Sequence, residues 1–205
     1  NFPILSSLIL LPSIGALFLF FTRSDKKNNF TVKYVALFTA LVNFILSIYL
    51  WILFDQTTSE FQFVEDRVWI KNLINYKVGV DGISILFIIL TTFITPLCII
   101  SVNKSINNRL NEFLIAILIM ETFMIGVFCS LDLVVFYLFF EAGLIPMFLI
   151  IGIWGGSRRV YSAFKFFLFT LLGSVLMLVA IISIYWITGT TDVVKLYEIG
   201  IDTKY

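Results

Sequence analysis

Long apolar runs separated by short polar segments make up most of this 205-residue chain. A helix needs about 20 predominantly apolar residues to cross the roughly 30 Å hydrocarbon core of a bilayer. Six runs come close to that length: Phe2–Thr22, Lys33–Phe54, Val80–Val102, Phe113–Cys129, Leu133–Trp154 and Ala163–Thr188. The pattern therefore predicts an all-α fold, a polytopic transmembrane helix bundle of six spans.

Composition narrows the class of protein further. Hydrophobic residues make up 60% of the chain, charged residues 13%, and the mean hydropathy is +1.03, which leaves too little polar surface for a water-soluble globule. The basic residues are scattered rather than gathered into a patch, so we expect lipids and no nucleic acid as partners. The chain has no histidine, and Cys98 and Cys129 fall near opposite membrane faces, so neither a metal or cofactor site nor a disulfide is predicted.

The distribution of Lys and Arg predicts the orientation, because basic residues concentrate on the cytoplasmic side. One set of connections carries nine of them and the other carries five: Arg23, Lys26, Lys27, Lys33, Lys104, Arg109, Arg158, Arg159 and Lys165 against Arg67, Lys71, Lys77, Lys195 and Lys204.

We divide the chain into spans one to three (1–102, with a surface loop at 55–79), spans four to six (103–188) and a polar C-terminal tail (189–205).

The surface loop contains two short β-prone pieces, Phe61–Val64 and Val68–Ile70, on either side of the charged Glu65–Arg67. Such pieces could form a hairpin on the membrane surface. A plain interfacial loop is the alternative that we favour from the sequence.

Two acidic residues lie deep in the spans, Glu121 in the fourth and Glu141 in the fifth. Each is nine residues from the turn at Ser130–Asp132, or roughly 13–14 Å at 1.5 Å per residue, close to the bilayer midplane. A carboxyl group there costs roughly 2.5–3.5 kcal/mol on insertion scales, so ion or proton handling is the first hypothesis. The alternative is a neutral acid that only packs, hydrogen-bonded to a backbone carbonyl or to a hydroxyl such as that of Thr122.

Neither acid has a cationic partner within these spans, because every Lys and Arg falls in a loop, at a span end or in the tail. The partner is therefore expected to come from elsewhere. Pro146, five residues after Glu141, removes a backbone donor and clashes with the carbonyl of Ala142. It predicts a break that either admits water beside Glu141 or is purely geometric.

The segment Phe139–Met147, FFEAGLIPM, resembles the FFE-x-x-LIPM signature of the chain 4 family, the antiporter-like membrane subunits of respiratory complex I (NADH:ubiquinone oxidoreductase). Other pieces of the resemblance follow in order: Val80–Ser84, Trp154–Gly155, Lys165–Ser174 and Gly189–Asp192. The resemblance covers nearly the whole chain. Multisubunit cation/proton antiporters share the glutamate and are the alternative family.

This resemblance implies part of a proton-translocation channel in the membrane arm of an enzyme, with Glu141 as the channel glutamate and Glu121 as a candidate relay. In the family the glutamate pairs with a lysine on the seventh helix. Lys165 matches a basic position at the inner channel mouth, where exposure or interfacial anchoring is its first interpretation. NADH, FMN, iron–sulfur clusters and ubiquinone belong to other subunits, and we expect this chain to bind none of them.

Complete members of the family have many more helices, arranged as inverted repeats. We therefore expect either a fragment or a split gene, with a second chain carrying the remainder alongside the other membrane-arm subunits. A cation/proton antiporter subunit and a non-transporting membrane scaffold are the alternative functions. The abundance of Phe, Ile, Asn and Lys suggests an AT-rich gene and favours the mitochondrial inner membrane over a bacterial plasma membrane.

Overall fold

The computed structural model describes residues 3–22, 29–70, 74–102, 106 and 109–199. The elements run α1 (Ile4–Phe21), α2 (Asn29–Leu53), β1 (Gln62–Ile70), β2 (Ile74–Val80), α3 (Gly82–Ser101), α4 (Leu110–Cys129), α5 (Leu133–Trp154), α6 (Arg159–Thr188) and α7 (Val193–Ile199). In this described part, α1 to α6 are long and apolar enough to cross a membrane. The predicted helical bundle is confirmed.

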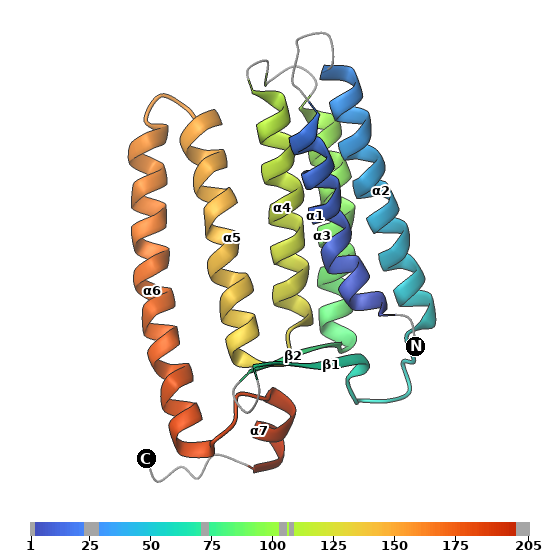
Figure 1. Cartoon of the computed structure of the whole chain (residues 1–205), viewed down its shortest axis with the longest axis vertical. Helices are drawn as coiled ribbons and strands as arrows, with labels where there is room; N and C mark the ends of the chain where they lie inside the picture. The colour runs from blue at the N-terminus through green and yellow to red at the C-terminus, as the bar shows by residue number, and fades with distance from the viewer. Residues whose placement is uncertain (1–2, 23–28, 71–73, 103–105, 107–108, 200–205) are drawn as a thin grey trace.

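The helices begin and end at two opposite ends of the bundle (Figure 1). Helices α1, α3 and α5 end at the upper end in Figure 1, which we call the inner end because the segments that follow these helices in the sequence carry the larger share of basic residues. The β-hairpin, the α4–α5 turn and α7 lie at the other end, the outer end. The two sets of connections distinguished by charge are thus separated by the length of the helices.

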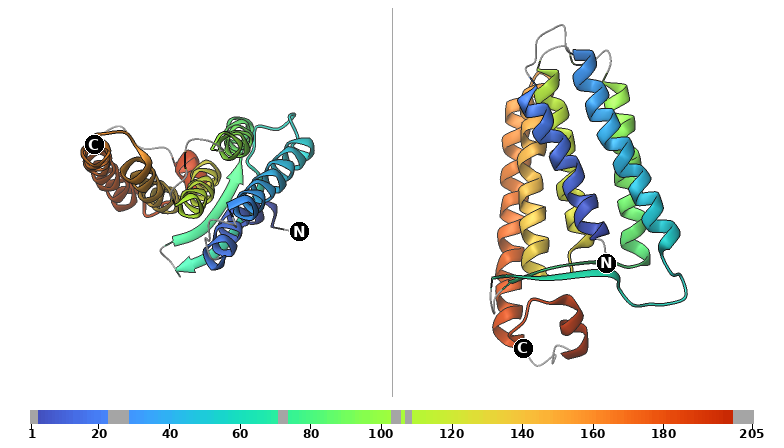
Figure 2. Two further views of the ribbon diagram at one scale, coloured as in Figure 1. Left: turned by 90° about the horizontal axis from the view of Figure 1, so that it is seen from above. Right: turned by 45° about the vertical axis from the view of Figure 1, so that its right-hand side comes forward.

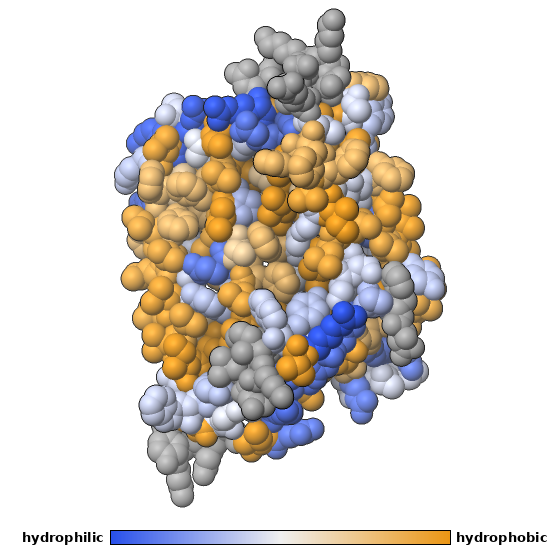
Figure 3. Space-filling model, viewed as in Figure 1, coloured by the Kyte–Doolittle hydropathy of each residue, from blue (hydrophilic) through white to orange (hydrophobic). Residues whose placement is uncertain are grey.

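Helices α1 to α4 pack together, α5 packs on α4, and α6 packs on α5 at the far side (Figures 1 and 2). The bundle of α1 to α4 has two apolar clusters, one around Leu19 and Leu114 and one around Leu8, Leu50 and Ile88. Helix α4, which the sequence placed in a segment with α5 and α6, contacts α1, α2 and α3 as well as α5. Figure 3 shows the apolar surface that spans the middle of the molecule.

Two helix boundaries depart from the apolar runs. Helix α6 begins at Arg159, earlier than the predicted Ala163. Helix α3 begins at Gly82 because Asp81 caps it, its side chain accepting a hydrogen bond from the Ser84 N–H. Burial of Asp81 opposes ionisation, but hydrogen bonds from Ser84 and Ile83 outweigh it and hold the pKa of Asp81 below its ordinary value.

The 55–79 segment forms a two-stranded antiparallel hairpin beneath the outer ends of the helices (Figures 1 and 2). The preference for a plain loop was therefore wrong. The expectation that Glu65–Arg67 separates two strands was also wrong, because all three residues lie within β1 and pair with Val78, Lys77 and Tyr76 of β2. Val78 and Val80 are fully buried against the helix ends, so the hairpin forms part of the core.

Glu65 joins the hairpin to the start of α1. Its Oε1 accepts a hydrogen bond from the Leu5 N–H at 2.9 Å, and its Oε2 accepts one from the Ser6 hydroxyl. A bulge in β1 lies between Gln62 and Glu65, with Phe63 at a φ of 54°, and bulges commonly re-aim neighbouring side chains. Because α1 has no side-chain cap of its own, Glu65 satisfies amide groups that would otherwise lack a partner.

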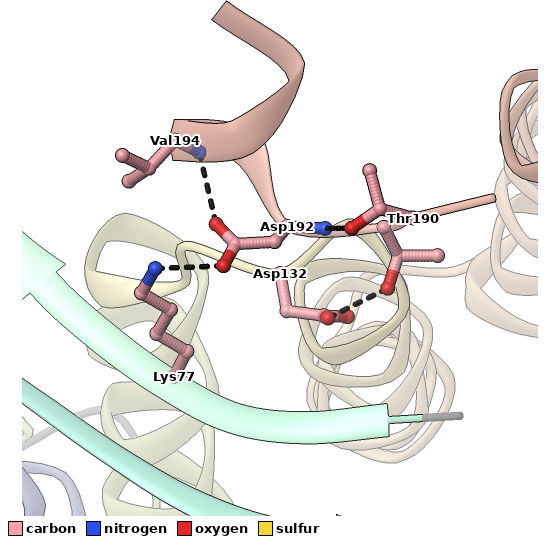
Figure 4. Close-up of polar contacts among 6 residues, drawn as sticks. Lys77, Asp132, Thr190, Asp192 and Val194 are labelled. Carbon is pink, nitrogen blue, oxygen red and sulfur yellow. Dashed lines mark hydrogen bonds and ion pairs between the residues drawn. The ribbon is translucent and has the colours of Figure 1, made fainter. Parts of the chain in front are cut away.

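Three segments meet at the outer end and fix the start of α5 (Figure 4). Asp132 caps α5 by accepting from the Val134 N–H at 2.9 Å, and its other oxygen accepts from the Thr191 hydroxyl at 2.7 Å. Asp192 forms an ion pair with Lys77 of β2 at 2.7 Å. Backbone bonds from the Leu131 N–H to the Lys77 carbonyl and from the Val193 N–H to the Leu131 carbonyl complete this outer ladder.

The outer ladder also determines the structure of residues that the sequence assigned to a polar tail. Asp192 accepts a hydrogen bond from the Val194 N–H at 3.0 Å, at the start of α7. Helix α6 ends at Thr188, and the next residue, Gly189, caps it with a φ of 72° that suits a residue without a side chain. Part of the expected tail is therefore a short helix anchored beside the hairpin.

Replacing Glu65 by Ala should loosen the outer end of α1. Loss of a helix cap costs about 1–2 kcal/mol, so the Leu5 and Ser6 amides should exchange with deuterium faster in Glu65→Ala than in the wild type. Asp66→Ala is the matched control, because Asp66 is the exposed neighbour of Glu65. Equal exchange in the two variants would show that the cap does not hold α1.

Candidate functional site

Glu121 lies in the interior of the α1–α4 bundle, with only 2% of its surface exposed. Its Oε1 accepts a hydrogen bond of 2.9 Å from the side-chain amide of Asn43, which is on α2 and fully buried. Sequence reasoning missed Asn43. A lone amide near the middle of an apolar run was the available signal, because such a group needs a polar partner in the membrane.

Hydroxyl groups make further polar contacts inside the same bundle. Ser13 of α1 and Thr122 of α4 lie 2.8 Å apart through their hydroxyl oxygens. Ser47 of α2 and Thr92 of α3 lie 2.7 Å apart in the same way. Each contact joins two helices, so polar bonds as well as apolar packing fix how the four helices are rotated against one another.

Glu141 lies in a different environment on α5. The residue is half-buried, and its Oε2 is buried with no hydrogen-bond partner among the residues that the structure describes. Helix α5 has few buried residues, namely Val135, Leu144 and Pro146. Buried polar atoms in folded proteins are nearly always hydrogen-bonded, so this oxygen makes Glu141 a candidate site residue.

Glycine sets the contact between α4 and α5. A Cβ atom added at Gly126 would lie 2.5 Å from Cδ1 of Phe139, so the Phe139 ring packs directly against the backbone of α4. Phe123 and Phe139 also make an aromatic contact, with ring centroids 6.5 Å apart. This contact places Phe139 on the face of α5 that is turned toward α4.

Glu141 is on the face of α5 turned toward α6. Phe148, seven residues or about two helical turns later, contacts Phe164 and Phe167 of α6 with ring centroids 5.4 Å apart. Glu121 is turned toward α2. The two acids therefore lie at similar distances from the α4–α5 turn on neighbouring helices, but they face different helices, α2 for Glu121 and α6 for Glu141.

Ser174 is a second residue that sequence reasoning did not single out for the site. Helices α5 and α6 run antiparallel, and Phe148 contacts Phe167, so moving about two turns along each helix brings Glu141 and Ser174 to the same level. Ser174 is only 2% exposed, and its hydroxyl donates to the Leu171 carbonyl at 3.0 Å. A buried hydroxyl at this level is a polar neighbour suited to a carboxyl group.

Lys165 and Pro146 take different places from Glu141. Lys165 is exposed near the inner end of α6, about two and a half turns from the level of Ser174. Pro146 is buried inside α5, which continues unbroken to Trp154. Of the two alternatives given for Pro146, the one in which it admits water beside Glu141 stays a prediction.

A groove of about 730 Å³ lies between α1, α4, α5 and the hairpin, but neither acid lines it. Its walls include Ser13, Trp69, Thr122 and Phe139. Among the described residues no cluster of three or more His, Cys, Asp or Glu side chains suited to a metal ion is found. Cys98 and Cys129 are both free.

Six apolar helices in the described part of the chain, with a carboxyl group near the middle of α4 and another near the middle of α5, define a polytopic membrane protein. Residues 130–204 match the family described as NADH:quinone oxidoreductase/Mrp antiporter, TM. The matched residues include the FFEAGLIPM segment, so the resemblance predicted from that segment is confirmed.

Named relatives support the same family along the rest of the chain. NADH-quinone oxidoreductase subunit M of Rhodobacter capsulatus is 60% identical over 164 residues, which is 80% of this chain and 32% of the relative. NADH-ubiquinone oxidoreductase chain 4 of Mycosarcoma maydis is 47% identical over 204 residues, 98% of this chain and 42% of the relative. The chain thus spans about a third to two fifths of the length of these relatives.

Solved structures show the same arrangement of helices. Respiratory complex I from Thermus thermophilus contains a chain that matches with a TM-score of 0.82 and 26% identity, over 98% of this chain and 40% of that one. An archaeal membrane-bound sulfane sulfur reductase matches with a TM-score of 0.77 and 17% identity, over 93% and 38% of the two chains. The second likeness establishes the fold alone.

Adding a methyl group at Gly126 should disturb the contact that positions α5. Overpacking of this kind costs about 1–3 kcal/mol, so Gly126→Ala should lower the thermal unfolding midpoint of the detergent-solubilised protein. Gly143→Ala is the control, because its added Cβ would meet Phe123 at an ordinary 3.6 Å. Adding Phe139→Leu should restore part of the loss, and a failure of both effects would contradict the close α4–α5 contact.

Proposed function

We propose that this chain is a membrane-arm subunit of proton-pumping NADH:ubiquinone oxidoreductase and contributes part of a proton-translocation path coupled to quinone reduction. One observation carries the proposal, namely the mid-span carboxyl group of Glu141, which keeps one oxygen buried and without a partner among the described residues. The named relatives, which are subunits of NADH-quinone and NADH-ubiquinone oxidoreductases, support the choice of enzyme.

Glu141 is the proton-carrying group in this proposal. A neighbouring cation favours the ionised form of a carboxyl group and apolar surroundings favour the neutral form, so the group exchanges a proton when a cation approaches or withdraws. No Lys or Arg of the described helices lies at its depth; on α5 and α6 the only ones are Arg159 and Lys165 near the inner end. The cation therefore belongs to the lysine-bearing helix that the family resemblance implies.

Glu121 is the second proton site, a relay inside the α1–α4 bundle. Its contact with Asn43 directs it away from Glu141, so a proton passing between them needs water or a side-chain rotation. Thr122, which follows Glu121 in the chain, contacts Ser13, and these hydroxyls extend the polar groups toward α1. Lys165 marks the inner membrane face in this scheme, near the channel mouth.

The remaining components of the enzyme follow from the resemblance. NADH, FMN, the iron–sulfur clusters and ubiquinone are bound by other subunits, and the partners of this chain are the other membrane-arm subunits, lipids and a chain carrying the remainder of the subunit if the gene is split. The relatives named chain 4 and the residue composition favour the mitochondrial inner membrane. The bacterial relatives, named subunit M, make a bacterial plasma membrane the alternative.

Glu141→Ala should abolish NADH-driven, quinone-dependent proton pumping in native membranes. A positioned proton-transfer group contributes roughly 100-fold or more, and a drop of that order is expected because Ala cannot carry the proton. Glu141→Asp should retain part of the rate. NADH oxidation by an artificial acceptor, which bypasses the membrane arm, should be unchanged in both.

Glu112→Ala is the matched control, because it removes an exposed acid from the first turn of α4. It should pump at nearly the wild-type rate. Normal pumping by an assembled Glu141→Ala variant would reject the proposal and favour the scaffold. Proton exchange for a cation without NADH or quinone would instead identify an antiporter subunit.

A further inference from the structure

Asn43 and Glu121 make one hydrogen bond and leave two oxygen atoms unused. The Asn43 Nδ2 donates to Glu121 Oε1 at 2.9 Å. The amide oxygen of Asn43, Oδ1, and the second carboxyl oxygen of Glu121, Oε2, are buried and have no hydrogen-bond partner among the described residues. The two unpaired atoms thus belong to the same two side chains that already touch.

Hydrogen-bond chemistry shows when these two oxygens can satisfy each other. An ionised carboxylate has only acceptors, and so has the amide oxygen, so the two atoms cannot bond while Glu121 is charged. A protonated carboxyl group has one O–H donor. When Oε2 carries the proton it can donate to Oδ1, and a ring of two hydrogen bonds then satisfies both side chains.

The surroundings of Glu121 provide no charge to balance a carboxylate. Helices α1 and α3 contain no Asp, Glu, Lys or Arg. The one charged residue of α2 is Lys33, ten residues before Asn43 and near the inner end, and α5 carries Glu141 on its α6 face. Apart from Glu121 itself, α4 carries only Glu112, in its first turn. A buried charge without a partner is far more costly than a neutral, hydrogen-bonded acid.

We propose that Asn43 is a positioning residue that holds Glu121 in its protonated form through a paired amide–carboxylic acid contact between α2 and α4. The bundle then stores a proton that Glu121 gives up only when this contact opens. The relay role of the stored proton rests on the proposed function, whereas the pairing itself does not.

Infrared difference spectroscopy of the assembled complex in native membranes tests the pairing. Wild type minus Glu121→Gln should show a C=O stretching band of a protonated carboxyl group, which identifies Glu121. In Asn43→Leu this band should move to higher wavenumber, because the carboxyl group loses its hydrogen bonds. Ser47→Ala, a buried polar-to-apolar change one turn along α2, should leave it in place.

Two outcomes would overturn the proposal: a carboxylate signal for Glu121 in the wild type, or a carboxyl band that does not move in Asn43→Leu. A purely structural role for Asn43 predicts the second outcome, since lost packing alone does not change the carbonyl frequency. Normal pumping by Glu121→Gln together with a shifted band would reject the relay role and keep the pairing.

Thermal unfolding supplies a second measurement if Asn43→Leu does not assemble. The side-chain amide of Gln at position 121 can make the same two hydrogen bonds as a protonated acid, so Glu121→Gln should unfold at the wild-type midpoint. Glu121→Leu, which breaks both bonds, should unfold at a lower temperature. A midpoint clearly raised by Glu121→Gln would mean that a buried charge had been removed, and would also overturn the proposal.

Discussion

A polar group inside the hydrocarbon core of a membrane must find its partner in the protein, and this requirement determines how α1 to α4 fit together. The side chains of Asn43 and Glu121, Ser13 and Thr122, and Ser47 and Thr92 each join two helices. Apolar packing alone would tolerate several rotations of a helix that is apolar all round. These contacts select one rotation of α4, which directs Glu121 into the bundle.

Helices α5 and α6 meet the same requirement less completely. Their mutual contact includes aromatic rings, Phe148 against Phe164 and Phe167, and Gly152 facing Ala163. Glu141 and Ser174 are the polar side chains brought to one level by this packing. Glu141, whose buried Oε2 has no hydrogen-bond partner among the described residues, therefore lies on a helix with few buried residues. The family signature falls on the same helix.

Residue types and spacing predicted the spans and the position of each acid along its helix, because these depend on length alone, and the membrane orientation stays a prediction. They did not predict which way each acid points, since helices with little amphipathic pattern give no periodic signal. Asn43 was missed because its partner lies 78 positions away in the chain. The hairpin was misjudged because Glu65–Arg67 looks like a turn, whereas Glu65 is a strand residue that caps α1.

The outer ladder of Lys77, Leu131, Asp132 and residues 191–193 has a mechanical consequence. It ties the hairpin, the start of α5 and the segment after α6 together at a single membrane face. At the other face, α5 packs on α4 through the rings of Phe113 and Trp154, whose centroids lie 5.1 Å apart, and on α6 through Phe148 and Phe164. The two ends of the α5–α6 pair are therefore held by different forces, with hydrogen bonds and an ion pair at the outer face and aromatic packing at the inner face.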